Sequence, residues 1–131
     1  MRRIAIVLFA LLSGCSSLAE KERTTRLENL MNGYTRTMEW SEFARALHYR
    51  KLTPDRPPQD LTPYQNIKIS EYRPGPATAG PDQHTVTRIV RLRYINQLRM
   101  TEHSLTAQEV WQYSAQDERW YLTSDLPVFP R

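Results

Sequence analysis

The sequence predicts an α+β domain, in which a pair of N-terminal helices packs on one face of a four-stranded antiparallel meander. Between positions 25 and 51, apolar residues recur with the spacing of a helix. After position 64 they alternate with polar residues, as in strands that have one buried face. The helical patterns come first and the strand patterns follow. This order is typical of proteins that place their helices on one face of an antiparallel sheet.

The helical region carries two apolar stripes. The first consists of Leu27, Leu30, Met31, Tyr34 and Met38, and the second of Trp40, Phe43, Ala44 and Leu47. At 100° per residue, the second stripe would lie on the opposite side of a continuous helix. One straight helix cannot bury both stripes in one place, so we predict a break near residues 39–41. Ser41 is the predicted N-cap of a second, shorter helix.

Proline and glycine separate the later elements. Four of the nine prolines fall within residues 53–63, which predicts an extended connector. The predicted strands cover residues 64–72, 84–96, 100–113 and 119–123. The Pro/Gly-rich stretch 73–83 is interpreted as a long hairpin connection rather than a binding loop, and 114–118 as a turn. The final residues, 126–130, either pack or trail.

The central hairpin has a predictable register. The apolar residues of its first strand stand at even positions 86–94, and those of its second strand at odd positions 105–113. Placing both on one side of the sheet requires even residues to face odd ones. A tight turn at residues 98 and 99 places Arg88 directly opposite Glu109. A turn one residue later would place Arg88 against Trp111, with a stacked guanidinium instead of an ion pair. We predict the first register.

The predicted buried side of each strand of this hairpin therefore carries one charge, which is Arg88 in the first strand and Glu109 in the second. A buried charge costs free energy unless it is paired. The favoured interpretation is a structural ion pair or a half-exposed sheet end. The alternative is a pocket between sheet and helix, lined by Arg88, Glu109, Trp111 and Tyr113. A single acid without a second tuned partner gives little support for acid–base catalysis.

No other chemistry stands out in the sequence. The histidines His48, His84 and His103 lack a metal-ligand spacing, and there is no glycine-rich phosphate loop or nucleophile elbow. We therefore predict no metal site, no catalytic residue and no cofactor. The 18 basic and 14 acidic residues give a net charge of +4, too mild a balance for the basic stripe of a nucleic-acid-binding protein.

The N-terminus has the layout of a bacterial export signal. Arg2 and Arg3 precede nine apolar residues at 4–12, and the small residues Ser13 and Gly14 follow. The run is too short for a membrane-spanning helix, which needs about 20 apolar residues. We predict a signal peptide at 1–14, a tether at 15–24 and one domain at 25–131. Removal of the signal would leave 16 basic and 14 acidic residues, a net charge of +2.

The sequence LSGC at residues 12–15 resembles the lipobox of bacterial lipoproteins. The resemblance implies cleavage before Cys15, a diacylglycerol on its thiol and a fatty-acid chain, such as palmitate, on its new amine. Three chains should anchor the protein permanently, because two signals already suffice for stable anchoring. Ser16 follows the cysteine, which resembles the pattern of sorting to the outer membrane. Cys15 is the only cysteine, so we predict no disulfide in the domain.

A second resemblance covers most of residues 25–130. Spaced aromatic motifs in this region are similar to those of small proteobacterial lipoproteins. They are Tyr34 with Trp40-Ser41-x-Phe43, the strand IKISEY, and VWQY followed by DERWYL. These proteins are largely uncharacterised and have a curved cystatin-like or nuclear-transport-factor-2-like sheet. Such folds host isomerases, hydratases and binding modules alike.

Together these features predict a lipid-anchored protein at the periplasmic face of the outer membrane. We expect a non-catalytic binding or structural module whose partners are the membrane, through the N-terminal lipid, and an unknown envelope protein. We expect no nucleic-acid partner. The alternative is a small-ligand-binding or isomerase- or hydratase-like domain that uses the pocket between sheet and helix.

Overall fold

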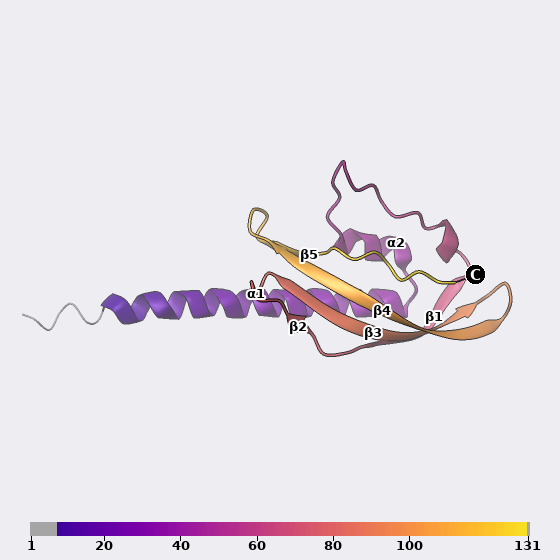
Figure 1. The fold of residues 1–131 in the computed structure, drawn as a ribbon, viewed down its shortest axis with the longest axis horizontal. Helices are drawn as coiled ribbons and strands as arrows, with labels where there is room; N and C mark the ends of the chain where they lie inside the picture. The colour runs from indigo at the N-terminus through magenta and orange to yellow at the C-terminus, as the bar shows by residue number, and fades with distance from the viewer. Residues whose placement is uncertain (1–7, 131) are drawn as a thin grey trace, which may run out of the picture.

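A computed structural model describes residues 8–130, with side chains from residue 18 onward. The elements are α1 (Leu8–Glu39), α2 (Phe43–Ala46), β1 (Ile67–Pro74), β2 (Thr78–Ala79), β3 (Thr85–Asn96), β4 (Thr101–Ser114) and β5 (Arg119–Leu122). Single 3₁₀ turns lie at Leu47–Tyr49 and Thr62–Tyr64. Both helices precede every strand of the described chain (Figure 1), which confirms the predicted α+β class.

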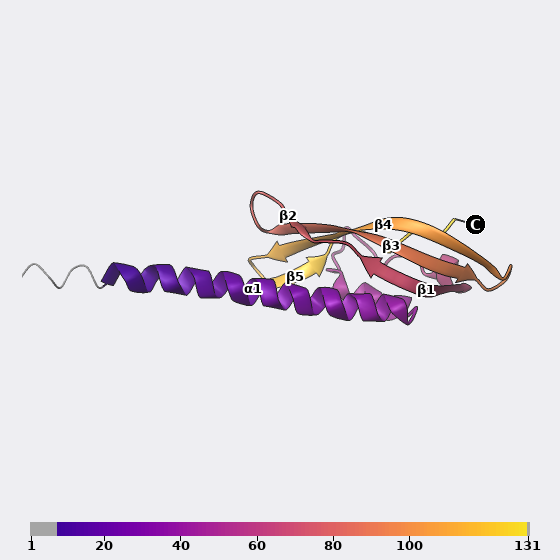
Figure 2. The same ribbon diagram turned by 90° about the horizontal axis from the view of Figure 1, so that it is seen from below.

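The strands form one antiparallel sheet in the order β1-β3-β4-β5, so the predicted four-strand meander is present. The sheet curls over α1, as Figure 2 shows. Its inner face packs against α1, and its outer face is open. The strand ends differ from the predicted ones by at most three residues. The largest difference is at β1, because a 3₁₀ turn occupies Thr62–Tyr64 where the strand was expected to begin.

The Pro/Gly-rich stretch 73–83 contains a strand that the sequence did not indicate. The short strand β2 pairs with Thr87 and Val86 of β3, on the same edge that β1 occupies further along. The backbone N–H of Gly75 donates to the carbonyl of Ile89 at 2.7 Å. A Cβ on Gly75 would lie only 3.0 Å from that carbonyl oxygen, so glycine permits the close approach. The stretch therefore follows β3 closely before it turns back at residues 80–84.

The helix break occurs where it was predicted, between Glu39 and Phe43. The first apolar stripe is the buried face of α1, with Leu27, Met31, Tyr34 and Met38 all buried. Three details of the prediction were wrong. Trp40 is 78% exposed, and Ala44 is exposed. Ala46, which was not part of the predicted stripe, is buried instead of Ala44.

The reason for these differences is the conformation of Ser41, whose φ of 57° is left-handed. This residue reverses the chain direction after α1, so the helical phase does not continue through Trp40. Ser41 is also not the N-cap of α2. That position belongs to Glu42, which makes no capping hydrogen bond. The Ser41 hydroxyl instead accepts a hydrogen bond from the backbone N–H of Ile69 in β1, at 2.8 Å.

Residues 15–24, the predicted tether, are helical and belong to α1. The side chains of residues 18–20 are exposed. Contact with the sheet begins at Arg23, whose carbonyl accepts a hydrogen bond from Trp120 Nε1 at 3.1 Å. The guanidinium of Arg23 also lies 5.4 Å from the ring centre of Tyr113. Among residues 8–130, neither helix has an apolar stretch of the length that a bilayer crossing requires.

The C-terminal segment 123–129, which we call the strap, packs against the domain. Leu126 and Phe129 are buried, and the Phe129 ring contacts Tyr94, with ring centres 4.7 Å apart. Phe129 also packs edge-to-face on Tyr64, with ring centres 5.5 Å apart. Of the two alternatives for the tail, the structure has the packed one.

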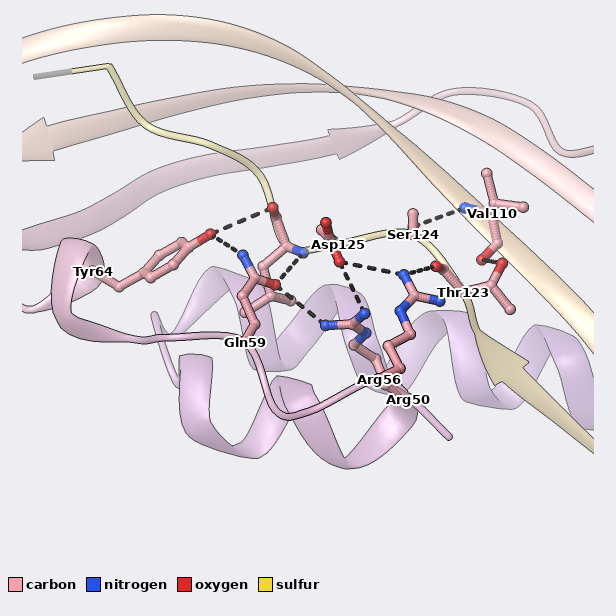
Figure 3. Close-up of polar contacts among 9 residues, drawn as sticks. Arg50, Arg56, Gln59, Tyr64, Val110, Thr123, Ser124 and Asp125 are labelled. Atoms are coloured by element: carbon pink, nitrogen blue, oxygen red, sulfur yellow. Dashed lines mark hydrogen bonds and ion pairs between the residues drawn. The ribbon is translucent and has the colours of Figure 1, made fainter. Parts of the chain in front are cut away.

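The proline-rich connector holds the strap in place by polar contacts (Figure 3). Gln59 accepts a hydrogen bond from the Leu126 N–H at 2.9 Å and donates one to Tyr64 Oη at 2.7 Å. Tyr64 in turn donates to the carbonyl of Pro127 at 2.7 Å. Arg50, buried beneath the connector, pairs with Asp125 at 2.9 Å. The connector thus acts as a clamp over the strap.

Candidate functional site

The predicted register of the central hairpin is confirmed. Strands β3 and β4 pair continuously from Thr85 opposite Gln112 to Asn96 opposite Thr101. Arg88 lies directly opposite Glu109 in this ladder. The connecting residues 97–100 centre on positions 98 and 99, which is the turn position of the first of the two predicted registers.

The two charges form a closed ion pair inside the domain. Arg88 Nε donates to Glu109 Oε1 at 2.9 Å, and Arg88 Nη2 donates to Oε2 at 3.2 Å. Arg88 is 8% exposed and Glu109 is 3% exposed. Arg88 Nη2 also reaches α1, where it donates to the Thr35 hydroxyl at 2.9 Å and to the Met31 carbonyl at 3.3 Å. The arginine therefore fastens the sheet to the helix as well as pairing with the acid.

Glu109 receives two further hydrogen bonds. Tyr72 donates its hydroxyl to Oε2 at 2.6 Å, and Trp111 Nε1 donates to Oε1 at 2.9 Å. Each carboxylate oxygen thus has two donors. Among the described residues, every buried side-chain nitrogen or oxygen has a hydrogen-bond partner. Such a fully satisfied network offsets the cost of removing the two charges from water.

Aromatic rings surround this network. Tyr34 of α1 packs edge-to-face on Trp111, with ring centres 5.7 Å apart, and on Tyr72 at 6.3 Å. Burial raises the pKa of Tyr34 and of Tyr72 well above the usual value for tyrosine. Tyr72 therefore keeps its proton at neutral pH and remains a donor to Glu109. The arrangement holds a carboxylate in place by four donors, which is the chemistry of a structural anchor.

Tyr113, the fourth residue of the predicted pocket, lies elsewhere. Its ring packs against His84 and Trp120, with ring centres 5.6 and 5.3 Å apart. This is the end of the sheet beside the N-terminal half of α1. The structure therefore brings together Arg88, Glu109 and Trp111, and separates Tyr113 from them.

A cleft of about 400 Å³ lies close to this end, between α1 and the hairpin of β2 and β3. Its lining combines apolar side chains with a polar rim. The apolar part includes Leu27, Met31, Val86 and Trp120, and the polar part includes Arg23, Glu28, Asp82 and His84. None of the four residues of the predicted pocket lines this cleft. The cleft arises because β2 and the following turn stand beside the helix, which the apolar pattern did not indicate.

Sequence reasoning also missed two partners of the ion pair. Strict alternation along β1 would place Tyr72 on the face opposite to Ile67 and Ile69. A bulge at Ser70 shifts the register of β1 and returns Tyr72 to the inner face. Thr35 adjoins the apolar stripe of α1, but a single hydroxyl in a helix gives no pattern that sequence analysis could detect.

The other two histidines are not among the residues that line the cleft. Cys15 lies within α1, in the part of the helix for which the structure does not describe side chains. His48 and His103 are exposed. In the described part of the chain, no three His, Cys, Asp or Glu side chains are arranged to hold a metal ion.

In comparisons with known proteins, no family model matches the chain, and neither does any curated protein or solved structure.

Proposed function

We propose that the chain is a lipid-anchored protein of the bacterial cell envelope, whose α+β domain is a non-catalytic binding module. The observation that carries the proposal is the LSGC sequence at residues 12–15, directly after a basic and apolar N-terminus. The proposed lipid sits on Cys15. Ser16 favours delivery to the outer membrane, with the domain facing the periplasm.

The path of α1 supports this role. The helix continues from the proposed anchor into the domain, where contact begins at Arg23. Eight residues of helix span about 12 Å, at about 1.5 Å per residue. Figures 1 and 2 show α1 as one continuous helix that extends beyond the sheet. A domain attached through this helix would lie close to the bilayer, at a distance that the helix sets.

The interior of the domain is consistent with a non-catalytic module. Glu109, the acid that the sequence suggested for a pocket, is committed to four hydrogen bonds within the core. The finer fold assignment, cystatin-like or nuclear-transport-factor-2-like, is part of this proposal. It is supported by the curled antiparallel sheet, with a long helix on its inner face.

Replacing the anchor residue, Cys15→Ala, is expected to abolish lipidation. The protein should then accumulate uncleaved or unacylated, because no other thiol is available to take the diacylglycerol. The measurement is metabolic labelling with a clickable fatty acid in a bacterial host, followed by membrane fractionation. Ser16→Ala, which keeps the thiol, serves as control and should retain the label. Label that persists on the Cys15→Ala protein would refute the proposal.

A second candidate function is the binding of a small, partly apolar ligand in the cleft between α1 and β2. Its size of about 400 Å³ and its mixed lining are typical of small-molecule sites. Ala79→Trp should fill the cleft from β2 and reduce the fluorescence of the apolar probe anilinonaphthalene sulfonate at least twofold. Ala115→Trp, at an exposed turn outside the cleft lining, is the matched control. Equal probe fluorescence in both variants, at unchanged thermal stability, would reject this candidate.

A further inference from the structure

The open face of the sheet carries a group of arginines that the proposed function does not use. Arg73 of β1 lies opposite Arg91 of β3, and Glu71 of β1 lies opposite Arg93 of β3. We call Arg73, Arg91 and Arg93 the arginine cluster. The three side chains project from the face opposite to α1, and those of Arg73 and Arg93 are 76% and 60% exposed.

The charges of this cluster are unbalanced. Glu71 contacts both Arg73 and Arg93, with its second contact at 3.6 Å. Within residues 18–130, no carboxylate lies within ion-pair distance of Arg91. Three guanidinium groups thus share one carboxylate, which leaves an excess of two positive charges. Like charges that stand directly opposite on adjacent strands destabilise a sheet, so the Arg73–Arg91 pair costs stability in the absence of an anion.

The surroundings supply further hydrogen-bond donors. Strand β4 places Ser104 opposite Arg93 and Thr106 opposite Arg91. Both hydroxyls line, with Glu71 and the arginine cluster, a shallow cleft of about 340 Å³. The cleft therefore presents guanidinium forks from two strands and hydroxyls from a third.

We infer that this cleft binds a phosphate group. Guanidinium is planar and matches the oxygens of phosphate by two parallel hydrogen bonds. A phosphate monoester carries a charge of about −1.5 to −2 at pH 7, which neutralises the excess of the cluster. Its oxygens can accept from both arginine forks and from the flanking hydroxyls at once. A single carboxylate would neutralise only half of the excess charge.

The test is thermal unfolding of the full chain in dodecyl maltoside micelles, at constant ionic strength adjusted with NaCl. Pyrophosphate and glycerol phosphate are titrated first. The wild-type protein should unfold at higher temperature as phosphate is added. Arg91→Gln should raise the melting temperature without phosphate, since it removes the like-charge pair, and should weaken phosphate affinity at least tenfold. Arg119→Gln, on the same sheet but outside the cluster, is the matched control and should behave as wild type.

A second arm distinguishes the two sources of the phosphate. Phosphatidic acid, whose headgroup is a phosphate monoester, or phosphatidylcholine is added to the micelles in place of the soluble compounds. Stabilisation by phosphatidic acid that depends on Arg91 assigns the site to a lipid headgroup. Stabilisation by the soluble compounds alone assigns it to a free phosphate ester. A phosphate effect of equal size in wild type, Arg91→Gln and Arg73→Gln would overturn the inference.

Discussion

Glu109→Gln is expected to lower the free energy of unfolding by about 3–5 kcal/mol, and Arg88→Met by a similar amount. Each single change leaves one charge buried without its partner, at positions that are almost inaccessible to water. The double variant should cost less than either single variant, because no unpaired charge remains. In the double variant, the glutamine oxygen can still accept from Trp111, and its amide N–H can donate to the Tyr72 hydroxyl, so both current partners of Glu109 stay satisfied. Denaturant unfolding of all four proteins gives the coupling energy, which should exceed about 3 kcal/mol because the double variant loses less than either single variant.

The protein contains a matched control for this cycle. Arg45 and Glu42 also form an ion pair at 2.9 Å, but their side chains are 70% and 45% exposed. Arg45→Met and Glu42→Gln should couple by less than about 0.5 kcal/mol, because solvent screens the charges. If the buried pair coupled no more strongly than this exposed one, the ion pair would not be the anchor that its geometry indicates.

At alkaline pH the domain is expected to lose stability steeply, because Tyr34 and Tyr72 are buried. Burial raises the pKa of both hydroxyls above the usual tyrosine value of about 10. Below pH 10 the two hydroxyls stay protonated in both the folded and the unfolded protein, so the full stability of the domain is present. Above pH 10 the unfolded chain releases them and the folded domain does not, so unfolding becomes more favourable. The loss should approach about 1.4 kcal/mol per pH unit for each of the two tyrosines.

Phenolate absorbance and circular dichroism, followed together from pH 8 to 12, measure this effect. Part of the absorbance of the seven tyrosines should appear only with unfolding. Tyr34→Phe and Tyr72→Phe should each reduce the pH dependence of stability above pH 10. Tyr121→Phe, which removes a hydroxyl paired with Asp117 at the surface, should reduce it much less. If all seven tyrosines ionised while the circular dichroism remained native, Tyr34 and Tyr72 would not be buried as described.

The part of the core that follows a long, regular pattern could be predicted from the sequence. Twelve consecutive pairs of β3 and β4 obey one register, so parity and the turn position were sufficient to place Arg88 opposite Glu109. The buried face of α1 was equally accessible, because Tyr34 and Met38 continue a stripe that begins at Leu27.

The sequence was uninformative where a single residue reverses a face or a direction. The bulge at Ser70 turns Tyr72 inward, and the left-handed φ of Ser41 leaves Trp40 exposed. Neither position is a glycine, so no composition signal marked it. The arginine cluster needed the structure for another reason. Arg73 meets Arg91 only through the pairing of β1 with β3, and a long, irregular connection hides that register from sequence analysis.

The strap and the connector that clamps it also determine when the domain can become complete. Gln59 and Leu126, which bond directly, are 67 residues apart in the chain. The β3–β4 hairpin, by contrast, joins residues that are near neighbours at its turn and can form early. During synthesis from the N-terminus, the core therefore stays open on the side of Phe129 until the strap has been made. A chain that lacks the strap would present this unsealed apolar side to chaperones and proteases.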